Sequence, residues 1–438
     1  MRLLLAALIS LLIPLNAVAS VTGLSLEGLM SPENMLSGRY GTPTPPPGSA
    51  PTSGGDLTGQ FSMGLLFEDI GEDRFLTLDI RNQLEVGPVK FGLQVPVSLR
   101  VWDEDPQDAD TVRTEAWDEI SDFAQILRFL ELNLGDETWG FRGRLGALDG
   151  ESIGHGTILA GYFNSIDRDH YQGGIALRAG FGFGGAELMV DNLLAPEIIG
   201  SRLFLRPAAW FSDADWAQNL VFGMSYVTDT NAPLSLKNGS TNANAEFEPV
   251  LDTQGNLVAT DRQSVDIVGF DLEYTVMKNA LIDIVPYVDL NMMRHAENGV
   301  GFHAGSFFNL KIPGGVGPTV MTRLEYRYAG ENYAPRYIDS LYEAHRLMFV
   351  PANAGSAPQT KLNWLKAGGH GNHGWLGELF FDFAGWVKLG GSYEDYEGPN
   401  NSALTLNLLL PRWETLQAGA LYTHRGFDSL SEAFQMNG

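Results

Sequence analysis

The sequence of 438 residues contains no cysteine and few basic residues, and each lack excludes a class of protein. Without cysteine, the chain cannot be a small secreted scaffold stapled by disulfides. Its 28 Lys and Arg residues stand against 53 Asp and Glu, so the formal net charge is −25. Such a chain has no basic excess to displace the counterions of phosphate, and we expect no nucleic-acid partner.

Long apolar runs are also lacking once the N-terminus is passed. No later stretch reaches the roughly 18 consecutive apolar residues of a transmembrane helix. Apolar residues nevertheless make up 44% of the chain, so they must be interleaved with polar ones. If the chain enters a membrane, we expect a closed β-barrel, the other structure that satisfies all backbone hydrogen bonds in lipid.

The N-terminus has the three parts of a secretory signal peptide, which we assign to residues 1–19. Arg2 supplies the positive end, Leu3–Leu15 form the apolar part, and Ala17-Val18-Ala19 is a small-residue cleavage site. The alternative is an uncleaved membrane anchor. Residues 20–58 follow as an N-terminal periplasmic segment, and Thr42–Gly55 within it is a proline-rich linker.

From Gln60 onward, apolar and polar residues alternate with period two. In Phe75–Val86 one face is aliphatic (Leu76, Leu78, Ile80, Leu84, Val86) and the other is polar (Thr77, Asp79, Arg81, Gln83, Glu85). Only a strand separates such residues onto two faces. The pattern recurs in 90–101, 141–145, 281–293 and 319–328, and it is less clean in Phe123–Leu134, where Arg128 interrupts the apolar face.

The connections between these segments fall into two length classes. Short turns include Gly135–Glu137, Met277–Ala280 and Pro411–Glu414, and long loops include Asp103–Asp122, Asp229–Ser264 and Ala329–His373. Short turns at one end and long loops at the other are typical of an outer-membrane barrel. We therefore predict an all-β fold, a transmembrane antiparallel up-and-down β-barrel of about 16–18 strands over residues 59–428. The alternative is a soluble β-sandwich or propeller.

This alternation and loop pattern, from Gln60 to Phe427, resembles Gram-negative outer-membrane β-barrels of the porin type. The resemblance implies export to the bacterial outer membrane, contact with its lipid and lipopolysaccharide, and passage of small solutes. A looser resemblance to uncharacterised myxobacterial-type outer-membrane barrels is carried by "IGHGTILAGYFNSIDRDHY", "APEIIGSRLFLRP" and "RYIDSLYEAHRL". It implies no activity, and neither resemblance indicates an oligomeric state.

Both termini of such barrels lie on the periplasmic side, which allows the strands to be counted. If the first strand runs outward, every long loop lies on the outer side of the membrane, provided that Gly154–Gln172 is counted as part of one long outer loop and not as a spanning strand. The count is then about 17 strands, from Gln60–Ile70 to Leu416–Arg425. The last strand runs outward, so we expect that the chain lacks a final strand and ends in a terminal loop-like segment, residues 429–438.

The polar face offers charges of both signs that would set the selectivity of a pore. The lumen candidates are Arg81, Arg100, Arg142, Arg144, Arg323, Arg327, Asp79, Glu85, Asp283, Asp289 and Glu325. The alternative is mutual neutralisation between neighbouring strands. A second set could narrow the pore if its loop folds inward toward Arg142 and Arg144, and otherwise the loop only caps the barrel. These constriction-loop candidates are Asp149, Glu151, Asp167 and Asp169.

Other polar clusters match no site. The acidic loop Asp103–Glu119 lacks the spacing of a calcium loop, and His370 and His373 lack a third ligand for a metal. We find no catalytic motif and expect neither enzymatic activity nor a cofactor. Six tryptophans near strand ends are expected in an interfacial girdle: Trp102, Trp210, Trp364, Trp375, Trp386 and Trp413.

These observations favour a porin-like outer-membrane channel for passive diffusion of small solutes through a charged lumen. The alternative is a structural or adhesive barrel that is plugged and whose long outer loops bind partners. A membrane-barrel enzyme comes third. A lumen blocked by loops would favour the plugged barrel, and an open one would favour the channel.

Overall fold

A computed structural model describes the chain from residue 58 to residue 434. Within these limits it leaves out residues 71–72, 103–110, 114–116, 118–122, 124, 136–138, 167–170, 213, 241–246, 253–256, 296, 312–318, 351–357, 369–372 and 414–415. The predicted signal peptide, most of the predicted N-terminal segment and the last four residues therefore lie outside the described residues.

Strands dominate the structure. The first ten are β1 (Thr58–Ile70), β2 (Asp73–Val86), β3 (Val89–Trp102), β4 (Leu127–Gly135), β5 (Trp139–Gly146), β6 (Asp149–Glu151), β7 (Tyr162–Phe163), β8 (Gly174–Phe181), β9 (Gly184–Val190) and β10 (Ile198–Leu205). The others are β11 (Leu220–Leu236), β12 (Ala259–Tyr274), β13 (Met277–Lys278), β14 (Ile282–Arg294), β15 (Asn298–Leu310), β16 (Thr319–Ala329), β17 (His373–Phe383), β18 (Val387–Tyr396), β19 (Ser402–Trp413) and β20 (Leu416–Phe427).

The helices that the structure describes are short, and all lie in connections except η4, which follows the last strand. They are η3 (Pro207–Trp210), α5 (Asp215–Gln218), α6 (Tyr342–His345), α7 (Lys361–Lys366) and η4 (Glu432–Phe434). No helix among the described residues is long and apolar enough to cross a membrane.

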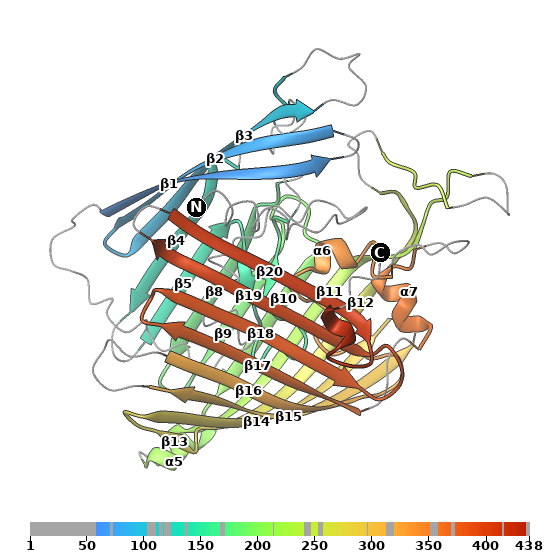
Figure 1. Cartoon of the computed structure of the whole chain (residues 1–438). Helices are drawn as coiled ribbons and strands as arrows, with labels where there is room; N and C mark the ends of the chain where they lie inside the picture. Colours follow the sequence, from blue (N-terminus) through green and yellow to red (C-terminus); the bar gives the residue numbers. More distant parts are fainter. Residues whose placement is uncertain are drawn as a thin grey trace.

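One antiparallel up-and-down sheet forms the wall of the molecule. Each strand pairs with its neighbours along the chain, with three exceptions: β5 pairs with β8, β12 pairs with β14 while β13 pairs only with β14, and β6 and β7 pair only with each other. The sheet has 18 strands, one of which, β13, is only two residues long. Figure 1 shows the sheet rolled into a barrel, with α6 and α7 at one end and α5 and β13 at the other. The predicted all-β fold and up-and-down barrel are confirmed.

The two edges of the sheet are β1 and β20. β1 pairs with β2 and β20 pairs with β19, and no ladder joins β1 to β20 among the described residues. The barrel is therefore open along this seam. The alternative of a soluble sandwich or propeller does not fit, because every long strand lies in one continuous rolled sheet.

The alternation in the sequence corresponds to the two faces of the wall. On β16, Leu324 is 58% exposed on the outside, while its neighbours Arg323 and Glu325 are at most 1% exposed on the inside. An apolar outer surface and a polar inner one are the features of a barrel that spans a membrane. These segments form strands because successive side chains of a strand point to opposite faces, which places the apolar residues toward lipid and the polar ones toward the lumen.

The interruption at Arg128 has a local structural cause. Between Gly92 of β3 and the start of β4 the register shifts, so that Gly92 faces Phe129 while Leu93 faces Leu127. This irregularity is a β-bulge, which leaves one residue of β4 without a partner and breaks the alternation. Arg128 is thereby turned toward the lumen, where its Nη2 lies 2.9 Å from Oδ2 of Asp149.

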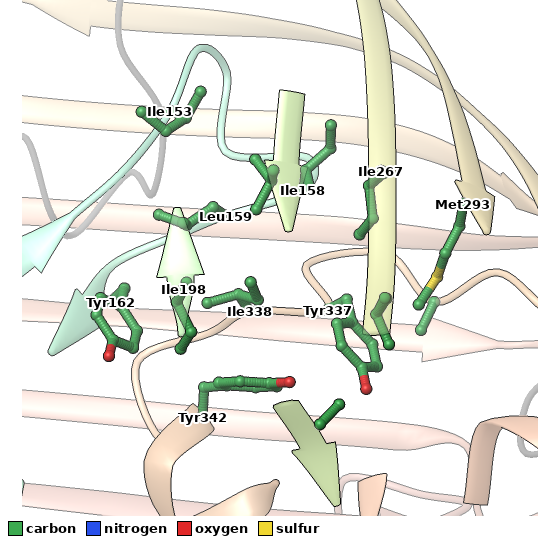
Figure 2. Packing of buried hydrophobic residues seen from close by; sticks show 14 of the residues in the cluster. Ile153, Ile158, Leu159, Tyr162, Ile198, Ile267, Met293, Tyr337, Ile338 and Tyr342 are labelled. Carbon is green, nitrogen blue, oxygen red and sulfur yellow. The ribbon is translucent and has the colours of Figure 1, made fainter. Parts of the chain in front are cut away.

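The lumen contains the largest apolar core of the protein. It is built from two connections that enter the barrel, residues 147–166 and the described part of 330–366, which together we call the plug. Leu159, Tyr162, Tyr333 and Tyr342 of the plug are fully buried. They pack with wall residues such as Ile198, Ile267 and Met293, as Figure 2 shows for part of this cluster.

Candidate functional site

The first plug segment crosses the lumen to the opposite wall. It leaves the sheet after β5 and returns at β8, and between these strands Glu151–Ile166 is buried almost throughout. The expectation that Gly154–Gln172 belongs to a loop and not to a spanning strand is therefore confirmed for its described residues. A connection that enters the lumen instead of capping it narrows the passage.

The turn Gly154-His155-Gly156 carries the contact with the far wall. Gly154 and Gly156 have φ values of 56° and 69°, which residues with a Cβ adopt reluctantly. The turn places the imidazole of His155 between two strands, with Nδ1 2.7 Å from Oδ1 of Asp289 and Nε2 3.0 Å from Oε2 of Glu273. The ring also stacks on Tyr287, with the centroids 4.2 Å apart.

Electrostatics fix the charge of this imidazole. Burial alone would lower the pKa of His155, but the neighbouring carboxylates, Asp289 foremost, raise it from 6.5 to about 10. His155 is therefore a cation at neutral pH, bound to acids of β12 and β14. Thr157 adds a hydroxyl donor to Asp289 at 2.7 Å. The loop is thus anchored to the wall by ionic and hydrogen bonds.

The second plug segment joins the first within the lumen. Leu159 and Ile338 form a parallel bridge, and the N–H of Ala160 donates to the carbonyl of Ile338 at 2.9 Å. Tyr333 lies directly against Gly301 of β15, where any Cβ would overlap its ring. Its hydroxyl is 2.8 Å from Nε2 of His303. The two segments therefore behave as one packed unit attached to the wall.

The predicted constriction residues pair with arginines of the nearby wall. Nη2 of Arg144 is 2.6 Å from Oδ2 of Asp149, and Nη2 of Arg178 is 2.5 Å from Oε2 of Glu151. Nη2 of Arg142 instead meets Oε2 of Glu131 at 3.0 Å. Asp167 and Asp169 lie outside the described residues.

The predicted charges of β16 are likewise paired. Glu325 bonds to both Arg323 and Arg327, and Nη1 of Arg327 lies 2.8 Å from Oε2 of Glu394. Nη1 of Arg323 lies 3.4 Å from Oε2 of Glu378. Across these strands, opposite charges compensate one another within the wall.

The remaining candidates are spread along the wall. Asp79 pairs with Arg81, and Lys311 pairs with Asp283 at 2.6 Å. The guanidinium of Arg100 lies over the ring of Phe75, 5.7 Å from its centroid. Glu85 is exposed beside the β2–β3 turn. A part in ion selectivity stays a prediction for every member of this set.

Beside the plug, a cavity of about 450 Å³ remains. It lies between the plug and the inner face of β17–β20. The plug side contributes Phe163, Leu341, Phe349 and Trp364, and the wall side contributes hydroxyl and amide groups, among them Ser392, Thr405, Asn407 and Thr423. None of the predicted lumen residues lines this cavity.

The charged groups of the cavity come mainly from the second plug segment and the last strands. They are Arg336, Asp339, Lys361, Glu378, Glu394 and Arg425. Inward faces were assigned from the sequence only to segments before residue 329, so Glu378, Glu394 and Arg425 were not identified. Nor could alternation identify Arg336, Asp339 or Lys361. These three lie in a connection without periodicity, and no local sequence signal marks them as lining a cavity.

Burial and charge pairing determine the protonation of the plug groups. Burial alone would raise the pKa of Asp339, but Lys361 and Arg425 hold it well below its usual value. Burial lowers the pKa of Lys361 to about 8 and that of His345 to about 4. At pH 7, Asp339 and Lys361 are therefore ionised, and His345 is neutral.

Metal ligation has no support among the residues that the structure describes. No group of three or more His, Asp or Glu side chains there could hold a metal ion. Of the predicted histidine pair, His370 lies outside the described residues. Nδ1 of His373 is 2.6 Å from the hydroxyl of Tyr326.

One expected girdle residue belongs to the plug instead. Trp102, Trp210, Trp375 and Trp386 are 57–66% exposed, as residues of an interfacial belt would be. Trp364 lies in α7, packs on Phe349 with the ring centroids 4.6 Å apart, and lines the cavity. Its expected place in the girdle was wrong, because α7 folds over the lumen. The side chain of Trp413 lies outside the described residues.

Comparisons with known proteins give a likeness in structure only. No protein-family model and no curated protein matches the sequence. Among solved structures, the chain is similar to OccK11 (OpdR) of Pseudomonas aeruginosa, with 11% identity over 85% of this chain and 90% of that chain and a TM-score of 0.34. It is also similar to an anion-selective porin from Comamonas acidovorans, with 10% identity over 85% and 96% and a TM-score of 0.31. A mutant porin of Rh. blastica has 12% identity over 84% and 100% and a TM-score of 0.29. These values are too low to transfer a function.

Proposed function

We propose that the protein is a porin-like channel of the bacterial outer membrane that conducts small solutes passively and without enzymatic activity. The observation that carries this proposal is the cavity between the plug and β17–β20. It has a polar wall on one side, and its volume of about 450 Å³ is within the range that holds a small organic molecule. Water and solute would pass beside the plug and not through the centre of the barrel.

The membrane location rests on the outer surface of the wall. Leu203, Phe270, Leu324 and Leu379 are between 45% and 66% exposed, and each is next in the chain to a buried charged residue: Arg202, Asp271, Arg323 and Glu378. Exposure of so much apolar surface to water would be unfavourable, whereas lipid accepts it. We propose contact with outer-membrane lipid and lipopolysaccharide on this surface, and export by the predicted signal peptide.

A plugged, non-conducting barrel is the second candidate. The apolar core in the lumen favours it, because Leu159, Tyr333 and Tyr342 are fully buried against the wall. In that case the long outer connections would bind partners and the barrel would serve as their support. The two candidates differ in one property, which is whether the cavity conducts.

Single-channel recording in a planar bilayer separates the candidates. Thr405 lines the cavity, whereas the adjacent Leu406 is 39% exposed on the outer face. For a channel, we expect openings that scale with salt concentration, a reduced conductance in Thr405→Trp, and no change in Leu406→Trp. A correctly inserted barrel without openings would establish the plugged form. Equal conductance of both variants would show that current does not pass through this cavity.

The charges predicted from the sequence have a proposed part in selectivity that can be tested in the same recordings. The side chain of Arg142 is 31% exposed, and that of Arg144 is 9% exposed between Glu131 and Asp149. We propose that Arg142→Gln shifts the reversal potential in a salt gradient. Arg144→Gln should chiefly weaken the attachment of the plug. An unchanged reversal potential in Arg142→Gln would exclude this residue as a selectivity determinant.

A further inference from the structure

The charges that line the cavity balance. Among the described residues the lining contains three basic side chains, Arg336, Lys361 and Arg425, and three acidic ones, Asp339, Glu378 and Glu394. The formal charge of the lining is therefore zero at neutral pH. This contrasts with the whole chain, whose net charge is −25. The net charge of the whole protein therefore does not predict the net charge of the cavity lining.

The charges also lie next to one another. Nη1 of Arg336 is 2.9 Å from Oε1 of Glu394 and 3.3 Å from Oε1 of Glu378. Asp339 accepts from Nζ of Lys361 at 2.7 Å and from Nη2 of Arg425 at 3.1 Å. Each charge thus has an opposite charge at contact distance, and the lining presents no row of one sign to the cavity.

The two sides of the cavity differ in chemistry. The plug presents aromatic and aliphatic surface from Phe163, Phe349 and Trp364, while the wall presents the hydroxyls of Thr405 and Thr423 and the amide of Asn407. Glu394 and Arg425 keep side-chain exposures of 20% and 39%. They can therefore accept and donate hydrogen bonds to a molecule in the cavity.

An ion and a neutral polar molecule meet different conditions here. An ion loses part of its hydration in a narrow passage and gains no opposite net charge from the lining. A neutral polyol exchanges hydrogen bonds to water for hydrogen bonds to hydroxyl, amide and paired charged groups, and its apolar face can lie on the aromatic side. Building on the proposed channel function, we propose that the cavity selects small polar solutes without net charge over ions of the same size.

Three solutes built on the same six-carbon polyol chain test this inference: sorbitol, which is neutral, gluconate, an anion, and N-methylglucamine, a cation. The measurement is their flux into proteoliposomes that contain the full chain, at neutral pH. We expect sorbitol to enter faster than either ion by about tenfold or more, because an uncompensated cost of about 1.4 kcal/mol already gives that factor. A flux of either ion equal to or above that of sorbitol would overturn the inference while leaving the channel in place. No flux of any of the three would instead contradict the proposed function itself.

Variants that add a charge to the lining without breaking an ion pair provide a second test of the inference. Thr405→Asp should favour N-methylglucamine over gluconate, and Thr405→Lys should reverse that preference. Arg262→Gln is the control, because Arg262 is exposed on β12 away from the cavity. If Thr405→Asp and Thr405→Lys both leave the order of the three solutes unchanged, the cavity does not select by charge and the inference fails.

Discussion

His155 and Asp289 lie 134 residues apart in the sequence, yet Nδ1 of the imidazole is 2.7 Å from Oδ1 of the carboxylate. The contact fastens the first plug segment to β14, on a part of the wall remote from the strands β5 and β8 that carry the segment. Both side chains are buried, His155 at 1% and Asp289 at 4% exposure. A buried pair of this kind holds a loop in one position, because separating the charges leaves each of them unsolvated.

Replacement of His155 by glutamine should loosen the plug. Loss of one partner of a buried ionic contact typically costs about 3–5 kcal/mol, so we expect a lower thermal stability and easier proteolysis within residues 147–166. His373→Gln, at the exposed outer end of β17, is the matched control and should behave as the unmodified protein. Equal proteolysis of the two variants would show that His155 does not anchor the loop.

The same contact predicts how stability depends on pH. The pKa of His155 is raised in the folded protein from 6.5 to about 10. Its contribution to stability is therefore complete below the unfolded pKa, and it declines as the pH rises and is lost above about 10. Thermal unfolding between neutral and alkaline pH should show this loss in the unmodified protein and a smaller one in His155→Gln. If the thermal stability of the two proteins declines equally with pH, the loss does not come from His155.

Truncation of Tyr333 should widen the passage. Its ring fills the space over Gly301, and removal of a buried aromatic side chain costs about 3–5 kcal/mol. We expect Tyr333→Ala to increase the single-channel conductance, since the second plug segment would lose its fixed position. Tyr328→Ala is the control, because Tyr328 is 38% exposed on the same stretch of chain. A conductance that stays the same in Tyr333→Ala would mean that the plug position does not limit current.

Because the chain contains no cysteine, a cysteine introduced at one position would be its single thiol and can report whether that position is accessible. A single Thr405→Cys should react with a charged, membrane-impermeant thiol reagent, and the reaction should reduce conductance, because this side chain lines the cavity. Leu406→Cys should not react in a lipid bilayer, since its side chain is on the outer face and a thiolate forms poorly there. Reaction of Leu406→Cys alone would reverse the assignment of the two faces.

Ion selectivity should change above the pKa of Lys361. Burial lowers that pKa to about 8, so deprotonation removes one positive charge and leaves the lining at a net charge of −1. The titratable and charged groups around Lys361 are Asp339, Tyr337, Tyr342, His345, Glu394 and Arg425. Between about pH 7 and pH 9.5, the reversal potential should shift toward cations. Lys361→Arg should abolish the shift, because arginine keeps its charge in this range. If the reversal potential of Lys361→Arg shifts by the same amount, the shift comes from the titration of another group.

Much of the wall could be predicted because it depends on local chemistry. The alternation Arg323, Leu324, Glu325 already separates a lumen face from a lipid face, and it does so whatever the rest of the chain does. The short turns and long loops then order the strands into an up-and-down barrel. The structure departs from simple alternation at Arg128, where a bulge in β4 turns an arginine inward. A bulge depends on the partner strand, which the segment itself does not reveal.

The candidate site could be predicted only in part. Inward faces were recognised for several strands before residue 329, but the position of the cavity was not, because it depends on which connections fill the lumen. Trp364 illustrates the difficulty. It was expected near the end of a strand, and only the folding of α7 over the lumen places it beside Phe349.

By itself, the sequence determined the period of the backbone, the two faces of the wall and the ends at which loops are long, because these properties arise between residues close together in the chain. Tertiary structure alone decided which loops enter the barrel, which charges neutralise one another and where space remains. His155 meets Asp289, and Leu159 meets Ile338, across separations that no local pattern encodes. The first contact forms because a buried carboxylate is stable only when a basic or hydrogen-bonding group compensates it, and the second because buried backbone groups need hydrogen-bond partners.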